Sequence, residues 1–136
     1  MTLSLPESRI QNFYADDQLW QRLTVIGKER KITMQVLLEE AVERWLPPFE
    51  ELETDENGMS LLPEIVPFYE NDTATNKQRM VPVSAQTRDR LQQYQQAYDG
   101  AMRAYTATLP DLPHPVGCTL SEVICSCLWL HAGEAG

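Results

Sequence analysis

The chain has 136 residues, a hydrophobic fraction of 43% and a formal net charge of −9, which suits one ordinary domain or two very small ones and excludes global disorder. No apolar run approaches the roughly 18 residues of a membrane span, and the N-terminus lacks the features of a signal peptide. We therefore expect a cytoplasmic protein without membrane contact, and the acidic balance argues against nucleic acid as a default partner.

The negative charge is concentrated in the middle of the chain. Residues 1–46 carry 6 basic and 7 acidic side chains, residues 47–76 carry none and 8, and residues 77–136 carry 5 and 5. The two flanks are therefore almost neutral. Together with the proline positions, this divides the chain into a first flank (1–46), a linker (47–76) and a second flank (77–136).

The first flank predicts a strand followed by two helices. Residues 9–15 alternate as an extended strand, and Asp16 or Asp17 is placed to cap the helix that follows. Residues 28–31 are polar and end this helix, and Thr33 is the candidate cap of the next one. The apolar positions at helical spacing are Leu19, Leu23 and Ile26 in the first helix, and Val36, Leu37, Ala41, Val42 and Trp45 in the second.

The linker begins at Pro47-Pro48, which stop the second helix. The acidic run ending in Asn57-Gly58 is typical of a solvated linker. Residues 59–69 are too apolar for a free linker and too rich in proline for a helix, so they predict an extended segment packed on one flank. Residues 70–76 predict a short polar tether.

The second flank repeats the order of the first. Residues 77–84 are extended and Ser84 caps a helix whose apolar positions run to Tyr105. The proline-rich stretch 109–117 ends it. "TLSE" (119–122) is a capping box, in which the threonine and glutamate side chains satisfy backbone N–H groups reciprocally. It opens a last helix that contains Val123, Ile124, Cys127, Leu128 and His131.

The two flanks superpose as a degenerate internal repeat. Leu19 and Leu23 match Thr87 and Leu91 at an offset of 68, whereas Thr33 matches Thr119 at an offset of 86. The 18 additional residues fall at the end of the first helix and in the proline-rich stretch. The repeat indicates two related units.

This pattern resembles the ribbon-helix-helix family, the Arc/MetJ/CopG class of DNA-binding proteins. The residues that carry the resemblance are "IQNFYA", "LWQRLTVIGKERKI" and "TMQVLLEEAVERWL" in the first copy, and "MVPVSAQTRDRL" and "TLSEVICSCLWL" in the second. It implies an α+β, mostly helical fold: a tandem ribbon-helix-helix in which two short strands pair as an antiparallel ribbon with four helices behind. The pairing could be intramolecular or between two chains of a homodimer.

The resemblance also implies a DNA-binding face, since alternate strand residues of the family enter the major groove. The base-facing positions are then Ile10, Asn12 and Tyr14 in the first strand, and Gln78, Met80 and Pro82 in the second. The inward positions are Phe13, Ala15, Val81 and Val83. Asn12 and Gln78 are the expected base readers, because an amide pairs bidentately with adenine.

Phosphate contacts are expected from two helix N-termini, Thr33-Met34 and Thr119-Leu120, whose backbone N–H groups attract anions. Arg9, Lys77 and Arg79 are expected to add cationic contacts. The chain departs from the family in three ways. Ile10, Met80 and Pro82 cannot read base edges through hydrogen bonds, Pro82 lacks an N–H, and Gln11 stands at an inward position. The second copy is thus expected to be a structural partner rather than a reader.

Several single features have a second interpretation. Cys118, Cys125, Cys127, His114 and His131 match no common zinc spacing, so buried thiols are favoured over a metal site. The tyrosines at 94, 98 and 105 are more typical of a core or an interface than of base stacking. The acidic run could compete with DNA for the basic side of the ribbon. No catalytic arrangement appears, so we expect neither an enzyme nor a cofactor.

We therefore expect sequence-specific binding of duplex DNA by a β-ribbon in the major groove, as a transcriptional repressor or a plasmid or mobile-element maintenance factor. The alternative is a protein-binding adaptor or an antitoxin that keeps the fold with weak or no DNA binding of its own. In that case residues 59–69 would contact the protein partner.

Overall fold

The computed structural model describes residues 8–63 and 69–135, with the side chains of residues 8, 9 and 135 left out. It is an α+β fold. The elements in chain order are β1 (Ser8–Ala15), α1 (Asp17–Arg30), α2 (Met34–Trp45), the short 3-10 helix η1 (Phe49–Glu51), β2 (Lys77–Ser84), α3 (Ala85–Thr106) and α4 (Leu120–Ala135). The strand–helix–helix order predicted for both flanks is confirmed. No helix in the described ranges is long and apolar enough to cross a membrane.

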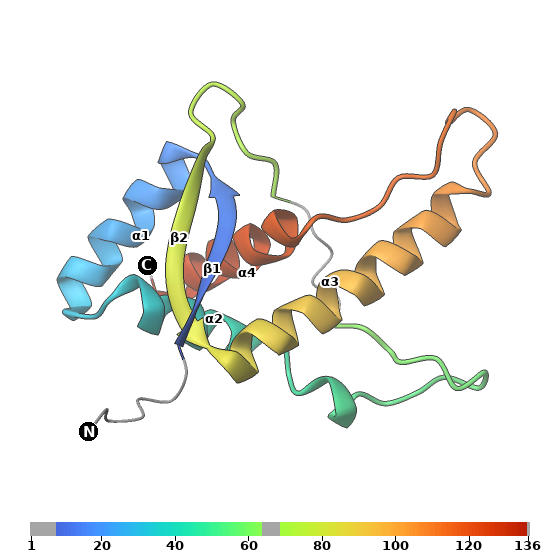
Figure 1. Ribbon diagram of the computed structural model, residues 1–136, viewed down its shortest axis with the longest axis horizontal. Helices are drawn as coiled ribbons and strands as arrows, with labels where there is room; N and C mark the ends of the chain where they lie inside the picture. The colour runs from blue at the N-terminus through green and yellow to red at the C-terminus, as the bar shows by residue number, and fades with distance from the viewer. Residues whose placement is uncertain (1–7, 64–68, 136) are drawn as a thin grey trace.

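The two strands form one antiparallel ribbon within the chain (Figure 1). Ser8 lies opposite Ser84 and Ala15 lies opposite Lys77, so the eight residues of each strand are all paired. An isolated two-stranded ribbon is marginally stable in water, so it depends on the helices behind it.

All four predicted helix caps are present. Asp16, Thr33 and Ser84 each accept a hydrogen bond from the backbone N–H three residues later. At α4 the capping box forms in both directions: the Glu122 N–H donates to Thr119 Oγ1 at 3.2 Å, and the Thr119 N–H donates to Glu122 Oε1 at 3.1 Å. These caps satisfy backbone donors that a helix cannot pair internally.

The second helix of each flank also bonds to the strand of the other flank. The Tyr14 N–H in β1 donates to Ser121 Oγ in α4 at 2.8 Å. The Ser84 N–H in β2 donates to Glu39 Oε1 in α2 at 2.8 Å. The two flanks are therefore interlocked, and α2 packs directly against α4 behind the ribbon (Figure 1).

One core serves both flanks. It takes the inward side of the ribbon and one face of each helix, and its fully buried members include Leu19, Leu23, Leu37, Leu38, Val83, Leu91, Tyr94, Val123 and Ile124. The last turn of α3 extends beyond this core, and the loop 107–119 returns from there to α4 (Figure 1). The Val116 N–H donates to Thr106 Oγ1 at 2.7 Å, which ties the loop back to α3.

The middle segment differs from its prediction in three places. The acidic run is exposed, as expected, but it is folded into η1 and a hairpin around Asn57-Gly58, in which Leu61 N–H donates to Glu53 O at 2.7 Å. Met59 and Leu61 are exposed rather than packed, whereas Leu62 and Tyr69 do pack on the core. Residues 64–68 of the predicted apolar segment lie outside the described residues. The supposed tether 70–76 is bonded to the first flank, as shown below.

Candidate functional site

The outward face of the ribbon is the candidate functional surface. Burial alternates along both strands with the predicted register. All six outward positions are exposed: Ile10, Asn12, Tyr14, Gln78, Met80 and Pro82. All four inward positions are buried: Phe13, Ala15, Val81 and Val83. Gln11 is also buried, as its inward position requires, at 5% exposure.

The hydrogen-bond phase of the ribbon explains why Pro82 is tolerated. The Tyr14 N–H donates to α4, outside the ribbon, so the Tyr14–Gln78 pair is a non-hydrogen-bonded pair. Because antiparallel pairs alternate, the Ile10–Pro82 pair four residues away belongs to the same class. A proline there removes no rung from the ladder.

The outward face has a polar half and an apolar half. Asn12 lies opposite Met80, and Gln78 lies opposite Tyr14, so the two amides are diagonal neighbours. With Tyr14 they form the polar half, next to Lys77 at the end of β2. Ile10, Met80 and Pro82 form the apolar half, and Ile10 and Met80 are 53% and 69% exposed.

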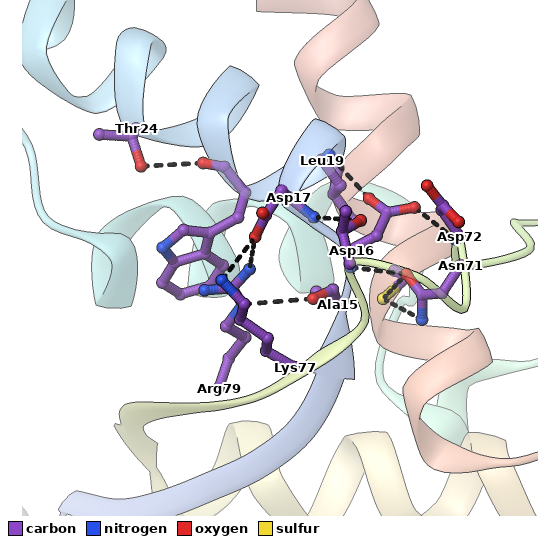
Figure 2. Close-up of polar contacts among 12 residues, drawn as sticks. Ala15, Asp16, Asp17, Leu19, Thr24, Asn71, Asp72, Lys77 and Arg79 are labelled. Atoms are coloured by element: carbon purple, nitrogen blue, oxygen red, sulfur yellow. Dashed lines mark hydrogen bonds and ion pairs between the residues drawn. The ribbon is translucent and has the colours of Figure 1, made fainter.

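The cationic residues expected to contact phosphate differ in their surroundings. The Arg79 side chain is only 14% exposed; its guanidinium pairs with Asp17 at 2.9 Å, donates to Ala15 O and lies over the Trp20 ring (Figure 2). Arg79 is thus directed at α1 rather than outward. Lys77 is exposed, and its Nζ lies 3.5 Å from Asp17 Oδ1. The Arg9 side chain lies outside the described residues.

The two helix N-termini expected to meet phosphates are not equivalent. At α2, Thr33 caps the helix, Met34 is half-buried, and the first turn holds no acidic residue. At the N-terminus of α4, which begins at Leu120, the Glu122 carboxylate accepts hydrogen bonds from the N–H and the hydroxyl of Thr119. The negative charge of Glu122 in the first turn of α4 therefore disfavours a phosphate there, whereas the first turn of α2 carries no such charge.

Asp16 has a larger role than the cap predicted for it. Its carboxylate is 1% exposed and accepts hydrogen bonds from the backbone N–H groups of Leu19 and Asp72 and from the Tyr69 hydroxyl. Asn71 accepts the Asp16 N–H (Figure 2). It also donates to Tyr14 O. Burial raises the pKa of Asp16, but these hydrogen bonds outweigh it and lower that pKa below 3.8. No local pattern in residues 69–76 indicates this anchoring.

The three cysteines are buried and free, and burial raises the pKa of each thiol to about 12. In the described part of the chain, no three His, Cys, Asp or Glu side chains gather as a metal site would require. Two of the tyrosines are core residues that donate to linker carbonyls, Tyr94 to Pro47 O and Tyr98 to Pro63 O, whereas Tyr105 is exposed.

Comparisons with known protein families, with curated proteins and with solved structures find no match. A functional proposal therefore rests on the ribbon and its surroundings. The ribbon offers an exposed surface of alternating side chains, with two amides and a phenol in one half. A two-stranded ribbon of this kind has the dimensions that a DNA major groove admits.

Proposed function

We propose that this chain is a tandem ribbon-helix-helix protein that binds duplex DNA sequence-specifically through the outward face of β1 and β2. It would act as a transcriptional repressor or as a plasmid or mobile-element maintenance factor. The observation that carries the proposal is the exposure of all six outward ribbon positions, three of them large apolar or aromatic side chains that a soluble ribbon would ordinarily cover.

The arrangement of the helices supports the same proposal. Each flank supplies one strand and two helices, the strands are antiparallel, and the second helices cross to the opposite strands. A single chain therefore has the pairing that the family obtains from two copies. The pairing between residues 8–15 and 77–84 makes a second chain unnecessary for the ribbon itself.

Base contacts are assigned to the polar half of the face. Asn12 and Gln78 would read adenine edges, and Tyr14 would pack on the neighbouring base pair. The open N-terminus of α2, at Thr33-Met34, would hold a phosphate on one flank. With Arg79 paired to Asp17 and the negative charge of Glu122 in the first turn of α4, few phosphate contacts remain, so the affinity should depend only weakly on salt.

The test is fluorescence anisotropy with a labelled duplex from the region upstream of the gene, a scrambled duplex of equal length, and several salt concentrations. We expect tighter binding to the upstream duplex. Asn12→Ala and Gln78→Ala should each weaken it by about 1–3 kcal/mol, whereas Gln92→Ala, an exposed amide on α3, should leave it unchanged. Equal binding of both duplexes by the wild type, or undiminished preference for the upstream duplex in both Asn12→Ala and Gln78→Ala, would refute direct readout by the ribbon.

A second candidate function is protein binding, as an adaptor or an antitoxin. It is favoured by the apolar half of the face, where Ile10, Met80 and Pro82 have no hydrogen-bonding side chain to offer a base. Absence of binding to either duplex at low salt would exclude the DNA-binding function of the isolated chain. Protein binding would then be the better account of the same face.

A further inference from the structure

A groove with an apolar floor and two lysines lies between the second half of α1 and the first turn of α2. Its volume is about 420 Å³, and Trp20, Leu23, Ile32 and Leu37 are among the residues that line it. Lys28 and Lys31 line it as well, and both are exposed. The groove therefore combines apolar surface with positive charge.

These two lysines differ from most cations of the chain. Arg30, Arg44, Lys77, Arg79, Arg90 and Arg103 each form an ion pair with a carboxylate. Lys28 and Lys31 form none with the residues that the structure describes. Two neighbouring unpaired lysines beside an apolar groove, on a chain of net charge −9, are complementary to an acidic segment with exposed apolar side chains.

The hairpin of residues 53–61 is such a segment. Asp55 N–H donates to Met59 O at 2.8 Å, and Thr54 pairs with Ser60. Because side chains alternate along each arm and match across the pair, Glu53, Met59 and Leu61 share one face. Met59 is 66% exposed and Leu61 is 50% exposed, so this face presents two uncovered apolar side chains beside a carboxylate.

The groove and the hairpin lie at opposite ends of the molecule (Figure 1). The turn between α1 and α2 is at the left of the view, whereas the hairpin extends at the lower right beneath α3. One chain therefore cannot fill its own groove with its own hairpin. A second copy can, because every copy carries both surfaces.

We propose that the hairpin of one copy docks into the α1–α2 groove of a second copy. Met59 and Leu61 enter the apolar groove. Glu53, on the same face, and Glu56, exposed in the turn of the hairpin, pair with Lys28 and Lys31. Donor and acceptor surfaces are different, so the contact is head-to-tail and can continue from copy to copy. The contact does not depend on the proposed DNA function. The docked hairpin would cover Thr33 and Met34, which line the same groove. Because the N-terminus of α2 at these residues is also the proposed phosphate contact, self-association is measured in the absence of DNA.

The experiment is sedimentation velocity of the full chain over a range of concentrations, at low and high salt. The wild type should associate reversibly, and salt should weaken the association. Lys28→Glu/Lys31→Glu and Glu53→Lys/Glu56→Lys should each associate about tenfold or more weakly, because each then places like charges at both surfaces. An equimolar mixture of the two variants should recover the association, because each hairpin again meets a groove of opposite charge.

A matched control separates local pairing from net charge. Lys28→Gln/Lys31→Gln removes two positive charges and Gln92→Glu/Gln96→Glu adds two negative ones, so each variant takes the net charge from −9 to −11. Gln92 and Gln96, however, are exposed on α3. Only the lysine variant should weaken association. A wild type that stays monomeric at every concentration, or a mixture that associates no better than either charge-reversal variant alone, would overturn the proposal.

Discussion

The hydroxyl of Tyr69 donates to both carboxylate oxygens of Asp16, at 2.8 and 3.0 Å, across 53 residues of sequence. The same carboxylate caps α1 through Leu19 N–H and holds the backbone of Asp72. One buried side chain thus joins the end of β1, the start of α1 and the segment that leads into β2. This contact fixes where the second strand begins.

Replacing Asp16 should destabilise the whole fold. Asp16→Ala leaves the Leu19 and Asp72 N–H groups and the Tyr69 hydroxyl without their acceptor, and should lower the free energy of unfolding by about 3 kcal/mol. Tyr69→Phe removes one of these bonds and should cost about 1 kcal/mol. Urea denaturation followed by circular dichroism measures both. Equal losses in the two variants would contradict the shared role of the carboxylate.

Gln11 offers a stabilising change. Its side chain is 5% exposed, and its Oε1 has no hydrogen-bond partner, although Nε2 donates to Asn12 O. Gln11→Leu should raise the free energy of unfolding by about 1 kcal/mol, because it removes a buried unsatisfied acceptor. DNA affinity should not change, since residue 11 faces the core. Thermal denaturation and the anisotropy titration test the two halves of this prediction independently.

Acid should weaken the contact between α1, α2 and α4. Arg30 donates to both oxygens of Glu40, and His131 Nε2 lies 3.1 Å from Oε1. The bonds from Arg30, with help from His131, lower the pKa of Glu40 from 4.5 to about 2 against the effect of its partial burial. The folded state therefore binds this proton more weakly than the unfolded state.

The stabilisation from Glu40 is accordingly complete above pH 4.5 and lost as the pH falls toward 2. Glu40→Gln should be less stable than the wild type at neutral pH, and the difference should shrink through that window. Melting temperatures of both proteins, measured at several pH values between 4.5 and 2, give this difference. Glu43→Gln is the control, because Glu43 lies one turn away on α2 with a side chain 75% exposed. A difference for Glu40→Gln that does not vary with pH would contradict the prediction.

The negative charge of Glu122 in the first turn of α4 predicts that removing this charge raises the DNA affinity. Glu122→Gln keeps a side chain that can complete the capping box but removes its charge from the helix N-terminus. DNA binding should strengthen by about 0.5–1 kcal/mol, and the dependence on salt should become steeper. Glu134→Gln, at the far end of α4, should change neither quantity. An unchanged affinity for Glu122→Gln would mean that this terminus does not approach a phosphate.

Much of the local structure could be predicted because short-range physics determines it. Asp16, Thr33, Ser84 and the Thr119–Glu122 pair act as caps through groups no more than three residues away. The alternation in 10–15 and 78–83 determined which side chains of the ribbon are buried, since the period of a strand is two. The inward position of Gln11 followed from the same parity.

The long-range partners could not be predicted in this way. The exposure of Met59 and Leu61 depends on where the linker runs, and hydrophobicity alone wrongly placed them against a flank. Asn71 and Thr75 bond to the first flank although their segment has the composition of a tether. Arg79 was expected to add a phosphate contact, but it pairs with Asp17 and lies over Trp20, which come within its reach only after β2 has paired with β1.

The sequence by itself therefore determined the helices, their caps and the two faces of each strand, because hydrogen bonds and side-chain periods of a few residues act within each segment. Only the tertiary structure decided which charges remain available. Ion pairs such as Arg79–Asp17 and Arg30–Glu40 form between separate elements, and their partners depend on the path of the chain. That path leaves Lys28 and Lys31 without a carboxylate partner among the described residues and directs Arg79 toward α1.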